Sequence, residues 1–212
     1  MTKVKICGIT SLEDALMAVE AGADALGFVF FDQSPRFIEP GRAARIIAEL
    51  PPFVQVVGLF VNASLDFVNL TADSCRLDIV QLHGEESPSY CQAVRRRVMK
   101  VFRVRGMESL APMADYQVAA FLLDAYSPNA YGGTGASFDW DCALAAKGHG
   151  PIVLAGGLDP DNVASAVARV VPYGVDVSSG VESSPGRKDA EKVRRFIREA
   201  KKPLQGRLPA PR

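Results

Sequence analysis

The sequence predicts a single compact α/β domain, a (β/α)8 TIM barrel in which each of eight parallel strands precedes a helix. Three observations lead to this fold. Eight short runs of the chain are almost entirely apolar, and runs without polar alternation are typical of parallel strands covered on both faces. Segments with a helical spacing of apolar residues lie between these runs. A closed barrel uses eight such units, whereas an open doubly wound sheet commonly has five or six strands.

The predicted strands recur along most of the chain. They are Val4–Cys7, Ala25–Phe30, Gln55–Val61, Ile79–Leu82, Lys100–Val104, Phe121–Asp124, Ile152–Ala155 and Val175–Ser178. Neighbouring parallel strands need a crossover connection between them, which is usually a helix. No GxGxxG motif follows the first strand, so the usual dinucleotide-binding fingerprint is absent.

Capping residues mark two of the predicted helices. Ser11 can cap the first helix, with Asp14 at the capping-box position and Gly22 as a stop. After the seventh strand, we expect Asp159 as the N-cap and Pro160 as the first helical residue. The remaining helices are predicted near 40–49, 64–76, 87–97, 106–117, 138–148 and 188–201.

The composition excludes several classes of protein. The 24 Lys and Arg balance the 24 Asp and Glu, whereas a general nucleic-acid binder needs a basic field. The longest apolar runs, such as the one from Phe53 to Val61, fall far short of the ~18 residues of a membrane span. The first residues lack the apolar stretch of a secretory signal. We therefore expect neither a nucleic-acid partner nor a membrane partner.

The cysteines indicate a reducing compartment. The chain has four, which show neither CxxC nor metal-ligand spacing: Cys7, Cys75, Cys91 and Cys142. Scattered cysteines in a chain of this size fit reduced thiols better than a disulfide framework. A cytoplasmic location is expected.

One domain is expected over residues 1–201, followed by a tail. Residues 202–212 contain three prolines and are expected to be disordered. The stretch 187–212 carries ten Lys or Arg against three Asp or Glu. This excess is interpreted as the solvated face of a last helix, although a basic tail could also meet an acidic partner.

Polar and glycine residues close most of the predicted strands. In such barrels the chemistry takes place at the C-terminal ends of the strands. The closing residues are Cys7-Gly8, the segment 32–36, Asn62, Gln81 with His83-Gly84, Arg103, Asp124, Gly156-Gly157, and Asp176 with Ser178-Ser179-Gly180. All of them should share one rim.

The glycines of this rim suggest a phosphate site. Glycine lets the backbone approach an anion closely, and barrel phosphate sites commonly follow strands seven and eight. Gly156-Gly157 and Ser179-Gly180 stand at those two places, and the loop 132–135 could close over the same group. The alternative is that these glycines only supply tight turns.

Cys7 and Asp124 suggest acid–base chemistry across the barrel mouth. A thiolate can act as a base and a carboxylic acid as a proton donor, if their surroundings adjust the two pKa values. The alternatives are a small buried apolar residue for Cys7 and a loop cap for Asp124. Arg36 follows a Ser-Pro turn, and its planar fork suits a carboxylate or a phosphate. A surface ion pair is the alternative for Arg36.

Ten motifs run in order over residues 3–190 and together resemble one family. They are KICGIT (5–10), GFVF (27–30), SPRF (34–37), VQLHG (80–84), LD (123–124), YGGTG (131–135), FDW (138–140), LAGGL (154–158), DVSSGVE (176–182) and PG (185–186). The sequence resembles the phosphoribosylanthranilate isomerases of tryptophan biosynthesis. The resemblance implies an aldose–ketose isomerase that carries out the Amadori rearrangement of N-(5-phosphoribosyl)anthranilate to 1-(o-carboxyphenylamino)-1-deoxyribulose 5-phosphate.

The resemblance also implies roles for individual residues. Cys7 would be the general base and Asp124 the general acid, and Arg36 would hold the anthranilate carboxylate. The phosphate would be held by backbone at Gly133, Gly135, Gly156, Gly157, Ser179 and Gly180. Rim residues complete the substrate-binding set: His83, Arg103 and Asp176. The reaction would need no metal or organic cofactor. The partner would be a small phosphosugar, and the protein a monomer or a homodimer.

Two other functions remain open at this stage. The first is another phosphosugar barrel, such as indole-glycerol-phosphate synthase or the histidine-pathway isomerase. The synthase would need a catalytic lysine, yet Lys3, Lys5 and Lys100 do not close their strands, and the histidine-pathway enzyme would need an aspartate in place of Cys7. The second is a sensor that binds a phosphorylated ligand without turnover.

Overall fold

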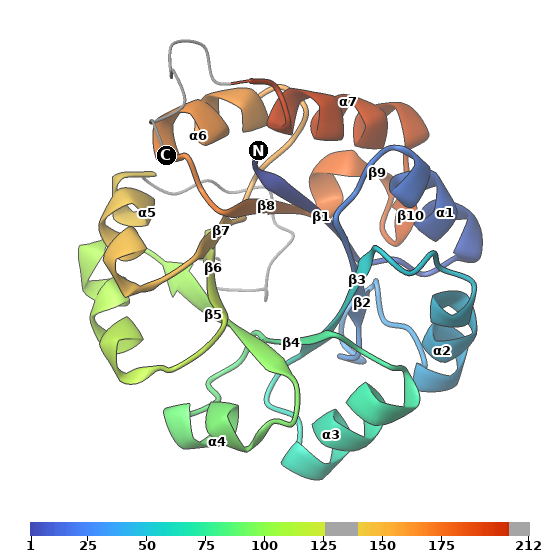
Figure 1. Ribbon diagram of the computed structural model, residues 1–212, viewed down its shortest axis with the longest axis horizontal. Helices are drawn as coiled ribbons and strands as arrows, with labels where there is room; N and C mark the ends of the chain where they lie inside the picture. The colour runs from blue at the N-terminus through green and yellow to red at the C-terminus, as the bar shows by residue number, and fades with distance from the viewer. Residues whose placement is uncertain (126–139, 204–212) are drawn as a thin grey trace.

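The protein is a closed eight-stranded barrel surrounded by helices (Figure 1). The computed structural model describes residues 1–125 and 140–203. Every neighbouring pair of barrel strands is parallel, and β8 pairs with β1 to complete the ring, with Lys5 opposite Asp176. The predicted (β/α)8 barrel is confirmed.

The barrel strands agree with the predicted runs to within a few residues. They are β1 (Lys3–Cys7), β2 (Ala25–Val29), β3 (Gln55–Phe60), β4 (Ile79–Leu82), β5 (Arg97–Val104), β6 (Ala120–Ala125), β7 (Ile152–Leu154) and β8 (Gly174–Val177). A small antiparallel hairpin, β9 (Glu182–Ser184) and β10 (Arg187–Lys188), follows β8. This hairpin was not predicted.

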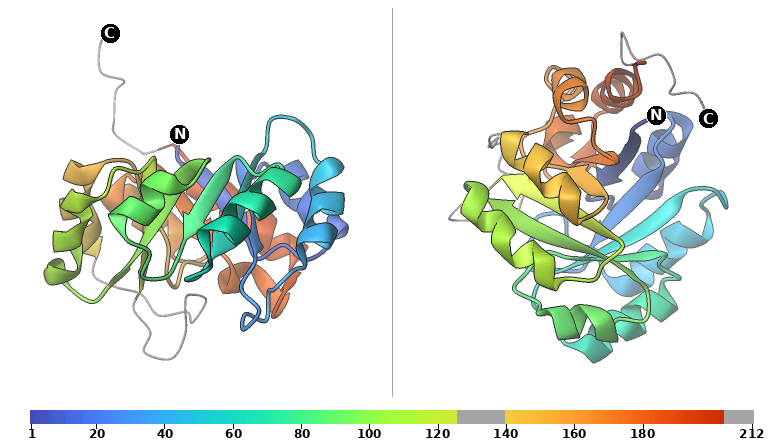
Figure 2. Two further views of the ribbon diagram at one scale, coloured as in Figure 1. Left: turned by 90° about the horizontal axis from the view of Figure 1, so that it is seen from below. Right: turned by 60° about the vertical axis from the view of Figure 1, so that its left-hand side comes forward.

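The helices form the outer ring, which Figure 2 shows edge-on. The α-helices are α1 (Leu12–Glu20), α2 (Pro40–Ala48), α3 (Leu65–Ser74), α4 (Pro88–Ala93), α5 (Trp140–Ala146), α6 (Val163–Val170) and α7 (Ala190–Ala200). Three 3₁₀ helices are η1 (Met107–Asp115), η2 (Lys147–His149) and η3 (Ser179–Val181). Within the described ranges, no helix is both long enough and apolar enough to cross a membrane.

The start of α1 follows the predicted cap only in part. The Ser11 side chain accepts a hydrogen bond from the Asp14 backbone N–H, and Gly22 adopts a φ of +96° just after the helix. The Asp14 carboxylate accepts instead from the backbone N–H of Lys188 in the hairpin, at 3.1 Å. Asp14 therefore ties the first helix to the last hairpin.

The predicted start of α6 is wrong. Asp159 accepts hydrogen bonds from the N–H groups of Asp161 and Asn162 and closes a turn, and the helix begins only at Val163. The Asn162 side chain donates to the carbonyl of Gly157. These bonds hold the loop after β7 in place.

Two other predicted helices differ from the structure. The segment near 106–117 is the 3₁₀ helix η1, because Pro112 lies inside it and lacks the N–H that an α-helix needs. The helix near 87–97 ends at Ala93, because Val94 is extended and the backbone N–H of Arg95 donates to the Asn69 side chain. The strand β5 consequently begins at Arg97.

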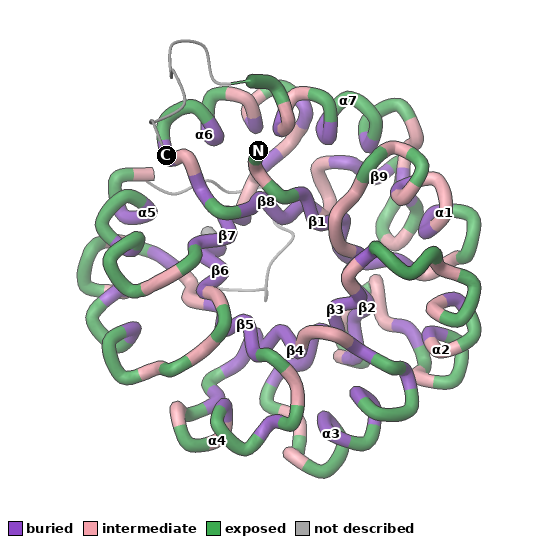
Figure 3. The backbone as a smooth tube through the Cα atoms, in the orientation of Figure 1, coloured by how far each residue is buried: buried purple, intermediate pink, exposed green. Residues whose placement is uncertain are grey.

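Buried residues are concentrated in the barrel strands and on parts of the surrounding helices (Figure 3), and those of the described core form two main clusters beside a smaller one at Cys7. The larger main cluster lies between barrel and helices and includes Ile6, Phe28, Phe60, Leu123 and Phe196. The second main cluster fills the barrel interior: Val57, Met99, Val101, Leu122, Val153 and Ala155. This filling leaves the carboxyl ends of the strands as the place for a site. All four cysteines are buried, and none of them forms a disulfide.

Candidate active site

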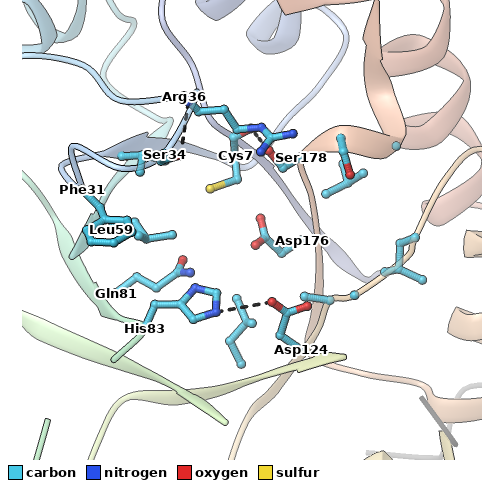
Figure 4. A pocket seen from close by; sticks show the side chains of 18 of the residues that line it. Cys7, Phe31, Ser34, Arg36, Leu59, Gln81, His83, Asp124, Asp176 and Ser178 are labelled. Carbon is cyan, nitrogen blue, oxygen red and sulfur yellow. Dashed lines mark hydrogen bonds and ion pairs between the residues drawn. The ribbon is translucent and has the colours of Figure 1, made fainter. Parts of the chain in front are cut away.

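A pocket opens at the carboxyl ends of the barrel strands, where Cys7, Asp124, Asp176 and His83 turn toward one common space (Figure 4). The predicted site residues that line it are Cys7, Arg36, His83, Asp124, Gly156, Gly157, Asp176, Ser179 and Gly180. The fold thus brings together residues that lie up to 173 positions apart, from Cys7 to Gly180.

Cys7 is the last residue of β1 and is buried, with 4% of its surface exposed. The Ser178 hydroxyl donates to its carbonyl oxygen at 3.1 Å, which links the ends of β1 and β8. Gly8 continues the chain at φ +81°, where a Cβ would lie 2.7 Å from Cδ of Arg36. Burial raises the pKa of the Cys7 thiol, and the neighbouring Lys5 ammonium opposes this rise.

Asp124 and His83 lie next to each other, on the side of the pocket away from Cys7 (Figure 4). The carboxylate belongs to β6, and the imidazole follows β4. Nε2 of His83 lies 3.4 Å from Oδ2 of Asp124, and both side chains are more than nine-tenths buried. The imidazole can therefore orient the carboxyl group.

A buried ion pair holds the loop that carries His83. Lys100 donates to Glu86 at 2.9 Å and to the carbonyl of Gly84 at 2.6 Å. The Glu86 carboxylate accepts from the backbone N–H groups of Asn62 and Gly84. Because these partners satisfy both buried charges, the loop is fixed next to the pocket. The role of Lys100 is therefore structural.

Arg36 is held by a second buried cluster. Its Nε and Nη2 donate to the two carboxylate oxygens of Glu182, each at 2.8 Å, and Lys188 donates to the same carboxylate at 2.8 Å. Burial alone would raise the pKa of Glu182, but the hydrogen bonds from Arg36 and the charge of Lys188 hold it below its ordinary value. The alternative interpretation of Arg36 was a surface ion pair. Arg36 does form an ion pair, but it lies at the pocket, and most of its side chain is buried.

The glycine turns after β7 and β8 lie beside each other in the pocket. Gly156 and Gly157 have φ values of +79° and +65°, in the left-handed region that favours glycine. A Cβ on Gly180 would overlap the carbonyl oxygen of Leu158, so the two loops approach too closely for any side chain there. This close backbone approach is what an anion-binding turn requires.

Three predicted substrate-binding residues are not brought to this pocket by the described structure. Arg103 donates to the exposed carboxylate of Glu85 at 2.6 Å and lines a separate groove with it. Gly133 and Gly135 lie outside the described residues.

Comparison with known proteins decides the family. The sequence profile described as N-(5'phosphoribosyl)anthranilate (PRA) isomerase matches residues 4–199. The chain belongs to the PRA isomerase family. An N-(5'-phosphoribosyl)anthranilate isomerase of Citrifermentans bemidjiense is 80% identical over 202 residues, which cover 95% of this chain and 98% of that protein. The predicted resemblance, the enzyme class and the tryptophan-biosynthesis assignment are confirmed.

Solved structures of PRA isomerases have the same fold. One, in complex with reduced 1-(o-carboxyphenylamino)-1-deoxyribulose 5-phosphate, is 43% identical, with a TM-score of 0.85 over 95% of this chain and 99% of that chain. Another contains mutually generated monomers of the dimeric enzyme from Thermotoga maritima. It is 43% identical, with a TM-score of 0.86 and the same coverage.

Sequence reasoning placed Gln81 on the rim without a role, and it assigned no role to Glu182 and Lys5, which lie beside the residues that line the pocket. Gln81 lines the pocket at 1% exposure, and its Oε1 has no hydrogen-bond partner among the described residues. Glu182 and Lys5 fix Arg36 and Asp176. Gln81 closes a predicted strand, and this position was its only signal. Glu182 and Lys5 gave none, because their partners lie 146 and 171 positions away.

Proposed function

We propose that this PRA isomerase carries out the Amadori rearrangement with Cys7 as the general base and Asp124 as the general acid. One observation carries the assignment: the buried side chains of Cys7 and Asp124, from β1 and β6, line the same pocket. An acid and a base on different strands can act on two atoms of one substrate held between them.

The protons balance as follows. Asp124 donates its proton to the ring oxygen of the ribose, the C1–O bond breaks, and the anthranilate nitrogen forms an iminium with C1. The Cys7 thiolate takes the proton from C2. The electron pair of that C–H bond forms the C1–C2 double bond and neutralises the nitrogen. The enolamine then tautomerises to the ketone.

The pocket walls support one orientation of the substrate. Val29, Leu59 and Val61 form an apolar wall next to Cys7, together with Phe31, which suits the aromatic ring of anthranilate. The glycine turns after β7 and β8 suit the phosphate at the opposite end. Cys7 belongs to β1, which lies between β8 and β2 in the ring. Its sulfur is therefore next to the middle of a substrate that spans the two ends.

Arg36 is proposed to bind the anthranilate carboxylate. Glu182 occupies Nε and Nη2, and no described residue accepts a hydrogen bond from Nη1. A guanidinium has five donors in a fixed plane, so it can hold Glu182 and a second carboxylate together. His83 and Asp176 are proposed to contact the substrate from the pocket wall. For Arg103, Gly133 and Gly135, substrate binding stays a prediction.

We also propose a cytoplasmic homodimer whose catalytic domain spans residues 1–201. The absence of a disulfide among the four cysteines supports a reducing compartment. The dimeric state named for the Thermotoga maritima relative supports a dimer. The closure of β8 on β1 supports a single domain.

A turnover assay tests the function. Freshly prepared N-(5'-phosphoribosyl)anthranilate is mixed with the protein, and the loss of its fluorescence is followed together with the appearance of the ketose product. We expect the protein to convert the substrate catalytically, so that the ketose appears as the substrate fluorescence is lost. Binding of the reduced product analogue without any conversion would contradict the proposal and would favour the sensor.

A further inference from the structure

We propose that Lys5 is a positioning residue that stabilises the thiolate form of Cys7. The inference rests on the proposed role of Cys7 as the base and adds a residue behind it. It follows from the buried arrangement of Lys5, Asp176 and Cys7 where β1 meets β8.

Lys5 lies directly behind Cys7 on the same strand. Residues two apart on a strand point to the same face, and Cys7 points into the barrel mouth (Figure 4). Lys5 is 5% exposed, and its ammonium donates to Oδ1 of Asp176 at 2.8 Å. Cys7 and Asp176 line the pocket, whereas Lys5 lies beneath them. Lys5 can therefore act on the substrate only through its neighbours.

Gly27 on β2 shows how closely the two side chains approach each other. It lies opposite Cys7 in the sheet. A Cβ built on Gly27 would lie 2.7 Å from Sγ of Cys7 and 3.1 Å from Cε of Lys5. Sγ of Cys7 and Cε of Lys5 therefore border the space that a side chain at position 27 would fill. Glycine at this position leaves that space open.

The base needs such a partner because Cys7 is buried. Burial favours the neutral thiol, and the pKa of Cys7 lies above its ordinary value. A thiol that stays protonated cannot take the C2 proton. A fixed positive charge beside the sulfur is the most direct way to restore the thiolate.

Other charged groups also face the sulfur, but Lys5 differs from them. They are Asp176 on β8, Lys188 on β10 and Arg36 in the loop after β2, with His83 and Asp124 across the pocket. Lys188 and Arg36 bind the Glu182 carboxylate, as Lys5 binds that of Asp176. Lys5 differs because it shares one face of β1 with Cys7 and opposes the rise in the Cys7 pKa more strongly than Lys188 does. Burial lowers the pKa of Lys188. For Lys5, burial works in the same direction, but Asp176 and Cys7 hold its pKa above the ordinary value, so it stays charged.

The arrangement assigns opposite effects to Lys5 and Asp176. The ammonium stabilises the thiolate, while the Asp176 carboxylate holds the ammonium and repels the thiolate. During the reaction the sulfur gains the C2 proton and becomes neutral, and Lys5 keeps all of its protons. Removing Lys5 should therefore raise the pKa of the thiol, and removing the charge of Asp176 should lower it.

Alkylation of Cys7 measures these effects directly. The rate of iodoacetamide addition is followed against pH on the peptide that contains Cys7, which separates it from the other three cysteines. We expect Lys5→Met to move the titration midpoint upward by about one pH unit or more, so the thiolate fraction at neutral pH falls about tenfold. The acid limb of the kcat profile should move in the same direction. Asp176→Asn should move the midpoint downward.

Controls separate this effect from loss of structure. Lys3→Met changes a lysine on the same strand that pairs with Asp24 at 2.9 Å and is largely exposed, and it should leave the midpoint unchanged. The charge-balanced variant Lys5→Met/Asp176→Asn should return the midpoint toward that of the wild type. If Lys5→Met does not fold, Lys5→Gln, which removes the charge but keeps a polar group that can donate to Asp176, makes the same test.

An unchanged midpoint in Lys5→Met, or in Lys5→Gln where Lys5→Met does not fold, would overturn the role of Lys5. This result is distinct from failure of the proposed mechanism. The alkylation midpoint reports on the thiol whether or not Cys7 is the base, and full turnover in Cys7→Ser would remove the base assignment alone.

Discussion

Arg36 and Glu182 form a two-pronged buried ion pair, with Nε–Oε1 and Nη2–Oε2 both at 2.8 Å. The pair joins the loop after β2 to the hairpin after β8, next to the Cys7 end of the pocket. Because two parallel hydrogen bonds fix a planar group in both position and angle, Glu182 sets the direction in which Arg36 faces the pocket.

Substitution of Arg36 should weaken substrate binding more than chemistry. We expect Arg36→Ala to raise KM at least about tenfold with a smaller change in kcat, because the carboxylate it is proposed to hold does not react. Arg36→Lys should not restore KM, since an ammonium cannot bond both Glu182 and a second carboxylate in one plane. Steady-state kinetics check both, and an unchanged KM in Arg36→Ala would exclude the carboxylate role.

Removal of the acid or the base should abolish most of the turnover. Cys7→Ser and Asp124→Asn should each lower kcat by about 10² or more, because positioned acid–base groups contribute roughly 10²–10⁴. Affinity for the reduced product analogue, measured by calorimetry, should change much less. Near wild-type turnover in both variants would refute the assignment.

Glycine at position 180 should be essential for phosphate binding. Gly180→Ala must displace the backbone at Leu158, so inhibition by inorganic phosphate should weaken and KM should rise. Gly148→Ala is the matched control, because a Cβ there meets no atom within 4 Å. Equal inhibition by phosphate in the two variants would place the phosphate elsewhere.

Stability should depend on pH through Glu182. Its pKa in the folded protein lies below the ordinary 4.5, so its ionised form is favoured by folding. This contribution is fully present above pH 4.5 and is lost as the pH falls through the lowered value. Glu182→Gln leaves two buried cations unpaired and should cost about 3 kcal/mol at pH 7.

Urea unfolding at several pH values tests this dependence. The difference between wild type and Glu182→Gln should shrink as the solution becomes acidic, because the wild type then loses the same charge. A difference that stays constant from pH 7 to pH 3 would show that the stabilisation is not ionic.

The sequence predicted the barrel well because its signal is local. Each strand is a continuous apolar run, and residues that end strands, such as Cys7 and Asp124, are placed at one rim by topology alone. The start of α6 was predicted wrongly because an Asp-Pro sequence, here Asp159-Pro160, is compatible with a tight turn as well as with the start of a helix. The partners of Lys5 and Glu182 were missed because they depend on distant segments, which no local pattern specifies.

The pairing of β1 with β8 has a consequence for folding during synthesis of the protein. The thiol, the ammonium and the carboxylate of Cys7, Lys5 and Asp176 meet only where the first strand joins the last. A nascent chain that has left the ribosome up to β7 would have an unpaired edge on β1, and such edges are prone to aggregation. Such a partly synthesised ring would also leave the sulfur without the Asp176 carboxylate and more open to solvent, so we expect the thiol to be shielded from side reactions only when the last strand docks.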